Sequence, residues 1–409
     1  MRDTFFRIWT TVCGMAALLA LTSGCDAEAP APVSSPDPLA AYGVEACAAA
    51  ADACRKEQRG CTLVDDVPTC TMCPEGHYPI SPLGACQPFV SERLSHTFQT
   101  YELQPGEEVG SLCRSWVLDN DEPLYINAVE FKTNGGYHHS NWFFVPEDHN
   151  GWTTEPWVDC YSGGFDEVSA ALAGGVIFAQ STQSLRELQK FRDGVVVRIP
   201  ARSRIITATH LLNYTAEPIT SSLELALHAI DPADVETTLT PFQLIYRPLD
   251  IPPKAESMFE SSCDIRSAYE DLFGDQPFEM KLHYLLPHYH ALGTELQVEV
   301  KGGPKDGQQL LDLGAYRPEP GGVVFDPPLD LSDADGLTFR CGYNNPRDEA
   351  VSWGIGDQEM CEALGFIESK MAFTAGPSEN TLLGVIHDDG VVWNQGECSV
   401  IGFGFNSGN

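Results

Sequence analysis

From about residue 92 onward, short runs rich in β-branched and aromatic residues alternate with turns rich in Gly, Pro, Asn and Asp. Runs of this length, bounded by such turns, are typical of β-strands. A polar stretch with several acidic residues, at about 230–240, precedes a second series of runs. The first series is Ile126–Phe131, Val195–Ile199, Arg204–Tyr214, Leu223–Ala229 and Phe242–Tyr246, and the second is Met280–Leu286, Thr294–Val300, Leu337–Tyr343, Val351–Ile355 and Glu362–Ile367. The pattern predicts an all-β fold of two tandem antiparallel β-sandwich domains of jelly-roll-like type.

Helical periodicity is confined to two short segments, Ser184–Lys190 and Ile265–Phe273, which does not support an α/β alternation. The chain of 409 residues exceeds what one hydrophobic core usually organises. We therefore expect separate domains, an N-terminal sandwich at 92–232 and a C-terminal sandwich at 233–409.

The first 25 residues predict export. Arg2 and Arg7 accompany an apolar run, Ile8–Leu21, which is too short for a permanent membrane-spanning helix. The sequence Leu-Thr-Ser-Gly-Cys at 21–25 resembles a bacterial lipoprotein signal, cleaved before Cys25, which would carry the lipid. Thr22 stands where that pattern prefers Leu, so ordinary secretion with cleavage nearby is the alternative. Both interpretations place the protein in the bacterial cell envelope, lipid-anchored or secreted, with membrane contact only through an anchor.

Two further segments precede the sandwiches. Residues 26–44 are mostly Ala, Pro, Ser and Asp and form a tether with little to bury. Residues 45–90 hold few large apolar side chains, so disulfides must stabilise them. The module resembles an EGF-like domain, although its cysteine spacing departs from the usual one and its pairing stays open; it would act as a spacer or a protein-docking module. Its cysteines are Cys47, Cys54, Cys61, Cys70, Cys73 and Cys86, and the Cys-X-X-Cys at 70–73 leaves zinc or redox chemistry as the alternative.

Six further cysteines divide between the sandwiches, so that each domain can pair its own in an oxidising compartment. Cys113 and Cys160 fall in the first domain, and Cys263, Cys341, Cys361 and Cys398 fall in the second.

The net charge is −34, from 24 basic and 58 acidic side chains. Such a charge repels the phosphates of nucleic acids and gives no support for adhesion to an anionic membrane. It is also the ordinary signature of a soluble exported protein, and it identifies no substrate.

The histidines suggest metal chemistry, because five of the eleven lie in two groups: His138-His139, and His283 with His288 and His290. Neighbours on a strand point to opposite faces, so His138 and His139 share a metal only if the strand ends or bends. Gly135-Gly136, separated from the pair only by Tyr137, makes a bend feasible.

His288 and His290 are spaced for the same face of a strand, at a strand start or edge marked by Pro287. Solvent-facing histidines are the alternative for both groups. Imidazole ligands favour copper, zinc, iron or nickel. The chain has no His-Glu-X-X-His helix, phosphate-binding loop, dinucleotide fingerprint or nucleophile elbow, which leaves oxidative metal chemistry.

Several motifs, in order, resemble the copper type II, ascorbate-dependent monooxygenases, the family of dopamine β-monooxygenase and peptidylglycine α-hydroxylating monooxygenase. The resemblance covers roughly residues 100–400. It is carried by Gly135–Phe144 with its His-His pair, Ile206–Tyr214 with His210, His288–Gly293, Arg340–Asn345 and Glu359–Cys361.

This resemblance implies an enzyme with two coppers per chain. His138, His139 and His210 would hold the copper that stores and passes electrons. His288, His290 and Met360 would hold the catalytic copper, whose soft thioether ligand favours Cu(I) and dioxygen binding. The enzyme would hydroxylate a C–H bond of a small substrate with O₂ and ascorbate or another one-electron reductant. The resemblance also implies the disulfides Cys113–Cys160, Cys263–Cys398 and Cys341–Cys361.

Three positions depart from the peptide-amidating branch of that family. Leu286, Glu362 and Leu364 stand where that branch has the Arg, Asn and Tyr that hold the substrate carboxylate. This argues against a glycine-extended peptide substrate; Glu362 would face a cationic amine or be solvated. The alternatives to an enzyme are a non-catalytic envelope lipoprotein that stores or senses copper, and a surface adhesion module.

Overall fold

The computed structural model describes residues 61–64, 67–70, 77–79, 86–149, 158–160, 164–165, 167–180, 185–213, 215–314, 322–354, 358–387 and 390–404. The expected signal peptide (1–25), its Cys25 and the tether (26–44) lie outside these residues, as does most of the Cys-rich module. Within that module β1 (Cys61–Val64) pairs with β2 (Val67–Cys70), and β3 (His77–Pro79) with β4 (Cys86–Pro88). In the described part of the chain, no helix has the length and apolar composition needed to cross a membrane.

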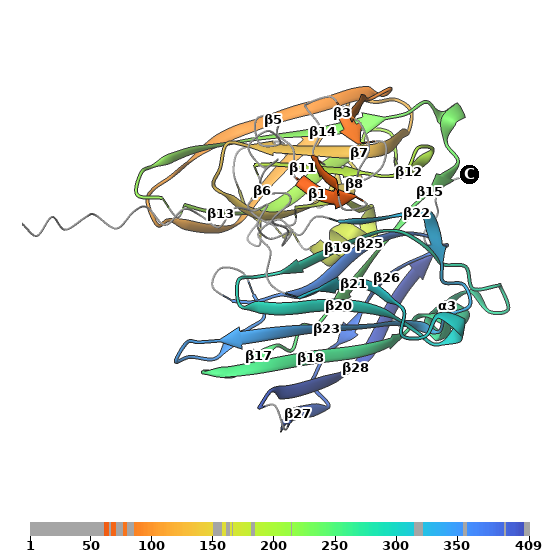
Figure 1. The fold of residues 1–409 in the computed structure, drawn as a ribbon. Helices are drawn as coiled ribbons and strands as arrows, with labels where there is room; N and C mark the ends of the chain where they lie inside the picture. The colour runs from red at the N-terminus through yellow and green to blue at the C-terminus, as the bar shows by residue number, and fades with distance from the viewer. Residues whose placement is uncertain are drawn as a thin grey trace, which may run out of the picture. The chain divides into compact units, whose positions relative to one another are not determined.

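The first domain is a sandwich of two β-sheets (Figure 1). One sheet has the order β10-β8-β13-β6-β9, and the other β15-β12-β7-β14-β5, with β11 paired to β7. Side chains that alternate inward from both sheets, among them Phe98, Trp142 and Leu225, fill the core at 2% exposure or less. The strands are β5 Glu92–Leu103, β6 Glu108–Val117, β7 Leu124–Thr133, β8 Tyr137–Val145, β9 Val158–Asp159, β10 Gly175–Ala179, β11 Arg186–Lys190, β12 Val195–Ile199, β13 Arg204–Leu212, β14 Ile219–Ala229 and β15 Thr237–Thr238.

The second domain is a sandwich whose two layers share one long strand. Residues 392–397 of β28 pair with β18, and residues 398–404 pair with β26, so β28 continues from one layer into the other. Phe259, Leu285 and Phe339 belong to the core between the layers. The strands are β16 Thr240–Ile245, β17 Asp250–Ile251, β18 Ala255–Asp264, β19 Lys281–Tyr289, β20 Gly293–Lys301, β21 Gln309–Leu313, β22 Val323–Asp330, β23 Gly336–Asn345, β24 Val351–Ser352, β25 Cys361–Glu368, β26 Met371–Pro377, β27 Leu382–Ile386 and β28 Val392–Gly404.

The protein is therefore an all-β protein of two tandem sandwiches, which confirms the predicted fold class. Most strand pairs are antiparallel; β12/β15, β16/β26 and β18/β28 are parallel. The chain leaves the first set of sheets after β15 and enters the second at β16, close to the boundary expected at 232/233. Short 3₁₀ turns lie at Pro232–Asp234 and Gly303–Lys305.

One of the two predicted helices is present. Helix α3 (Ile265–Phe273) begins where the Asp264 carboxylate accepts the Ser267 N–H at 3.0 Å. The helix predicted at Ser184–Lys190 is wrong, because Arg186–Lys190 forms strand β11. There the Arg186 guanidinium reaches buried Glu130 on β7, and these tertiary contacts outweigh a weak local helix preference. The sequence pattern did not reveal α2 (Glu167–Ala173).

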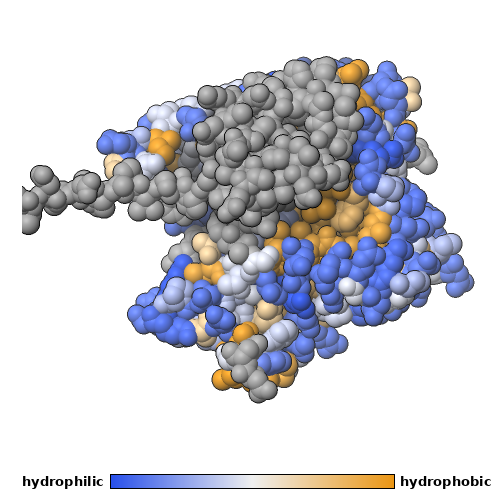
Figure 2. Space-filling model, viewed as in Figure 1, coloured by the Kyte–Doolittle hydropathy of each residue, from blue (hydrophilic) through white to orange (hydrophobic). Residues whose placement is uncertain are grey.

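The surface of the second domain is largely hydrophilic, in keeping with the acidic composition (Figure 2). Figure 2 shows a hydrophobic area at mid-height on this face, and exposed hydrophobic residues also gather on strand β27. All five of its residues are exposed, including Leu383 and Ile386, and hydrophobic atoms are visible at the surface where β27 lies in Figure 1. Its only strand partner among the described residues is β28.

Candidate metal centre

The first group of histidines lies on two adjacent strands of the first domain. His210 on β13 pairs directly with His139 on β8, and the next pair is Leu211 with Tyr137. His138 is therefore the extra residue of a β-bulge, which lets two consecutive side chains serve one site. Gly135 and Gly136 enter the strand with φ of +121° and +81°, values that L side chains rarely adopt. The bend anticipated from the sequence is thus a bulge after a glycine turn.

These three imidazoles are buried and close together. Their ring centroids lie 4.8 to 5.1 Å apart, and none is more than 8% exposed. Nε2 of His210 donates to the Glu108 carboxylate at 2.7 Å, while Nδ1 of His210 and Nδ1 of His139 have no hydrogen-bond partner among the described residues. A buried nitrogen without a partner is costly unless it ligates something, so both point to a metal. Glu108 fixes the tautomer that leaves Nδ1 of His210 available.

The second group lies at the end of β19 beside the start of β25. Nε2 of His288 and Sδ of Met360 are 3.2 Å apart. His290 donates from Nδ1 to the Gln358 carbonyl at 2.8 Å, which leaves its buried Nε2 without a described partner. This end of β19 thus offers a buried nitrogen donor, Nε2 of His290, and a thioether sulfur in contact with His288.

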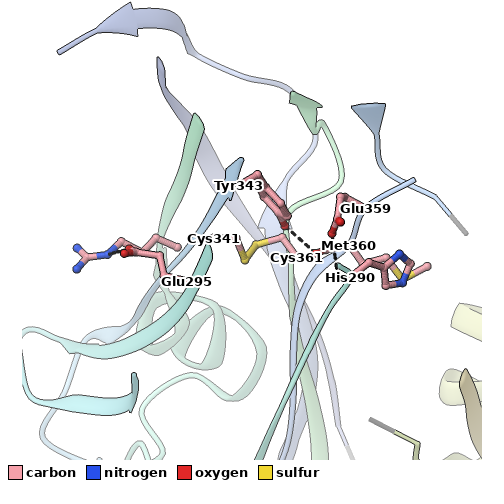
Figure 3. Close-up of a disulfide and its surroundings, with 8 residues drawn as sticks. His290, Glu295, Cys341, Tyr343, Glu359, Met360 and Cys361 are labelled. Carbon is pink, nitrogen blue, oxygen red and sulfur yellow. Dashed lines mark hydrogen bonds and ion pairs between the residues drawn. A yellow bond between two sulfur atoms is a disulfide. The ribbon is translucent and has the colours of Figure 1, made fainter. Parts of the chain in front are cut away.

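Met360 is held in place from several sides (Figure 3). The Tyr343 hydroxyl donates to the Met360 carbonyl at 2.7 Å, and Cys361 is bonded to Cys341 on β23. The Glu359 carboxylate accepts the N–H of His290 at 2.9 Å and that of Leu292 at 2.7 Å. One carboxylate thereby ties the His290 backbone to the segment that carries Met360.

The two groups meet. His139 lies 5.2 Å from His288 and 5.5 Å from His290 between ring centroids, and His138 lies 5.7 Å from His290. Two sets of three residues each have ligand atoms that all lie within 4.8 Å of one another. One set is His138, His139 and His210, and the other is His139, His288 and His290. Two nitrogens bound to one ion at about 2 Å each lie at most about 4 Å apart, so small shifts suffice to bind a metal.

The electrostatics suit ligation, because a metal binds neutral imidazole. Burial, and then the charges of neighbouring histidines, lower the pKa of His138 to about 3. The same causes hold the pKa of His139 well below its ordinary value. Burial also lowers the pKa values of His210 and His290. These imidazoles are therefore neutral at pH 7.

A largely apolar cavity of about 140 Å³ follows the metal cluster along the facing strands. Between β19 and β25, His288 pairs with Glu362, and Leu286 pairs with Leu364. On β8, Asn141 and Phe143 follow His139 on the same face. Except for the two histidines, these residues all line the cavity. Its walls come from both domains, and its lining residue Glu362 is paired with His288 across the sheet.

Glu362 is the buried acid of this cavity, 4% exposed. Burial raises its pKa to about 7, although Gln243 donates a hydrogen bond to it at 3.0 Å. The carboxyl is therefore not solvated, contrary to one of the two interpretations of the sequence. Leu286 and Leu364 line the cavity beside it, so all three positions that depart from the peptide-amidating branch face one space.

All six ligand-type residues named from the sequence come together, whereas His283 does not join them. It is buried on β19, with Nε2 3.7 Å from Glu368. The three disulfides Cys113–Cys160, Cys263–Cys398 and Cys341–Cys361 are present. Sequence reasoning did not find Glu108, and it used Tyr343 and Glu359 only as parts of motifs. No local spacing marks any of the three.

Comparison with protein-family models and with curated proteins finds no match. Solved structures similar to this chain include VP54 of PBCV-1 (8% identity, 68% of this chain and 94% of that chain, TM-score 0.23). Others are the major capsid protein P2 of bacteriophage PM2 (8%, 68% and 98%, TM-score 0.27) and the Cowpea mosaic virus top component (8%, 67% and 89%, TM-score 0.32). None of these is a copper monooxygenase, and at such identities and TM-scores the similarities carry no functional conclusion. Function has to be inferred from the geometry of the candidate metal centre.

Proposed function

We propose that this protein is a copper-dependent monooxygenase, similar to the copper type II, ascorbate-dependent family, that hydroxylates a C–H bond of a small substrate. The observation that carries the proposal is the buried cluster itself. Five imidazoles and a thioether converge there, and three of the imidazoles have a ring nitrogen that no described residue satisfies. Neutral nitrogens with a soft sulfur form a donor set that suits copper, above all Cu(I).

Bound copper would supply one-electron redox chemistry and, at the set that includes Met360, dioxygen binding. The overall reaction is R–H + O₂ + 2e⁻ + 2H⁺ → R–OH + H₂O. Ascorbate or another one-electron reductant of the cell envelope supplies the two electrons. The first-domain histidines would hold the copper that stores an electron, and the second-domain ligands the copper at which the substrate reacts.

The chain's own residues would do the rest. The cavity beside His288 would bind the substrate and exclude water, because most of its wall is apolar. Glu362 and Gln243 offer the polar contacts that would orient it. Ligands from both domains and a cavity walled by both domains bring the substrate next to the metal cluster.

The test is copper content together with product formation in the exported protein. We expect two coppers per chain and an ascorbate-dependent product that carries one atom from ¹⁸O₂, detected by mass spectrometry across a screen of small apolar substrates. Met360→Ile should abolish O₂ consumption and remove copper from the second set. Met371→Ile is the matched control, since Met371 is buried in the same domain but lies in the core on β26. If Met360→Ile retained both copper and O₂ consumption, the ligand assignment would be wrong.

One observation favours a second candidate, a non-catalytic copper-storing or copper-sensing protein of the envelope. The cavity positions Leu286, Glu362 and Leu364 lack the groups with which the peptide-amidating branch binds its substrate. Two bound coppers without any hydroxylated product would support this candidate. Absence of copper would instead support the adhesion module. In each case we propose an exported protein, anchored through Cys25 or released.

A further inference from the structure

The sheet of the first sandwich that contains β7 and β14 has a buried patch on its outer face. Leu227 pairs with Val129 between these strands, and both side chains belong to the core between the two sheets. The neighbouring pairs point to the opposite, outer face, because side chains alternate along a strand. These pairs, Ala226 with Glu130 and His228 with Ala128, form what we call the outer patch, and none of the four residues is more than 1% exposed.

The outer patch contains polar and charged groups that an uncovered sheet would leave in water. The Glu130 carboxylate accepts a hydrogen bond from Nε of Arg186 at 2.9 Å, and Nε2 of His228 lies 3.8 Å from that carboxylate. Removing ionised groups from water is costly, and it requires a layer of protein packed over them. The sheet is therefore covered at the outer patch.

Two residues that precede β5 contact His228 in this patch. The Phe89 ring is stacked on the imidazole, with 3.8 Å between the ring centroids and 22° between the planes, and the Ser91 hydroxyl lies 3.3 Å from Nδ1. Val90, between them, is 91% exposed. The chain is thus held on the outer patch by one aromatic and one polar contact.

Phe89 directly follows the last strand of the Cys-rich module. Strand β4 ends at Pro88 and pairs with β3, so these two strands form a hairpin of the module that leads straight to Phe89. Cys86 and Phe89 are three residues apart, which limits the distance between their Cα atoms to about 11 Å. The hairpin therefore ends beside the outer patch.

We infer that the Cys-rich module, residues 45–90, docks through Phe89 on the outer patch of the first sandwich and covers its charged groups. The module is then a fixed layer of the first domain and not a free spacer. This inference goes beyond the proposed function and is independent of it, since the outer patch contains none of the six ligand-type residues. The tether at 26–44 would leave from this face of the first domain, and an anchor at Cys25 would be attached on this side.

The experiment measures how accessible His228 is in the full-length protein with its disulfides intact. Diethyl pyrocarbonate modifies exposed neutral imidazoles, and mass spectrometry of peptides quantifies each histidine separately. His387 is exposed and serves as the internal reference. We expect His228 to react at least about tenfold more slowly than His387, since the reagent reaches it only when the module opens. Equal rates would overturn the inference. Protection that is lost on dilution would also overturn it, because the cover would then be a second chain.

Two substitutions disrupt the docking from opposite sides. Phe89→Ala deletes the aromatic contact, and Ala226→Arg places a large charged side chain beneath the module. Both should bring the reaction rate of His228 close to that of His387. Protection retained in either variant, folded as judged by circular dichroism, would overturn the inference. In Ala226→Arg it would show that the Phe89 ring alone covers His228.

Each substitution has a matched control. Val90→Ala changes the exposed neighbour of Phe89, and Ser95→Arg adds the same charge at the exposed position of β5 that pairs with Ala226. Both controls should keep His228 protected. Loss of protection in the controls as well as in the variants would contradict a specific docking surface.

Discussion

The two halves of the candidate metal centre are held in place by different means. In the first domain, main-chain geometry places the ligands: His139 and His210 are a paired position of two strands, and His138 is the bulge beside them. In the second domain, Met360 precedes its strand and depends on the Cys341–Cys361 disulfide and on Tyr343. The first set is therefore as stable as its sheet, whereas the second can be weakened without unfolding the sandwich.

The largest effect should come from removing the disulfide beside Met360. In Cys341→Ser with Cys361→Ser, we expect copper to be lost from the second set and kept by the first. The free energy of unfolding should fall by about 2–4 kcal/mol, a typical contribution of a disulfide. Copper titration and chemical denaturation measure the two effects. Cys113→Ser with Cys160→Ser is the control: a similar loss of stability should leave the Met360 set loaded. Equal copper loss from both double variants would contradict the comparison.

The next effect concerns the stability of the first sandwich. Glu130 on β7 is 1% exposed and contacts the Arg186 guanidinium, with His228 at 3.8 Å. Burial raises the pKa of Glu130, but His228 and Arg186 outweigh it and lower the pKa from 4.5 to about 2. Since the folded-state pKa lies below the unfolded one, this stabilisation is present above pH 4.5 and is lost as the pH falls toward 2. It amounts to roughly 3 kcal/mol.

Glu130→Gln should remove that pH dependence and destabilise the fold at neutral pH, because Arg186 loses its charged partner. Copper binding at pH 7 should be unchanged in both sets while the protein remains folded. Unfolding free energy measured between pH 2 and pH 7 checks the first point, and copper titration the second. Selective loss of the first copper set would show that its geometry depends on more than the sheet.

A smaller and more local effect is expected from Glu359→Gln. The carboxylate accepts two backbone N–H groups, of His290 and Leu292, with two different oxygens. An amide offers one acceptor oxygen, and its NH₂ group would face the other N–H. Copper affinity of the second set should fall by about 10–100-fold, the usual cost of losing a group that orients a ligand. Glu362→Gln is the control, since the Glu362 side chain is hydrogen-bonded to Gln243, which is not a ligand residue, and it should change copper affinity little. A first-set affinity reduced equally by Glu359→Gln would contradict the separate supports.

Much of the fold follows from residue patterns. Strand β12 occupies Val195–Ile199 and α3 occupies Ile265–Phe273, as predicted, because hydrophobic periodicity and an Asp cap act locally. The helix predicted at Ser184–Lys190 was wrong because Arg186–Lys190 pairs with β7 as a strand, and no local sequence pattern encodes that contact. The continuation of β28 between layers is likewise a tertiary property.

The candidate metal centre, like the fold, was only partly predictable from the sequence. The ligand residues were recognisable as an ordered set of motifs, although each histidine pair alone was weak. Their convergence across two domains could not be predicted, because the sequence does not show how far apart the two sandwiches lie. Glu108 also escaped notice: it is separated from His210 by 102 residues, and only the strand pairing brings its carboxylate to Nε2.

The bulge at His138 is needed for the ligand set but not for the strand pairing. Deleting one codon would restore an uninterrupted ladder between β8 and β13, since the flanking pairs are already in register on each side. Such a protein would keep its sandwich and lose a ligand. Any metal binding that uses His138 would thus depend on a bulge residue that the strand pairing itself does not require.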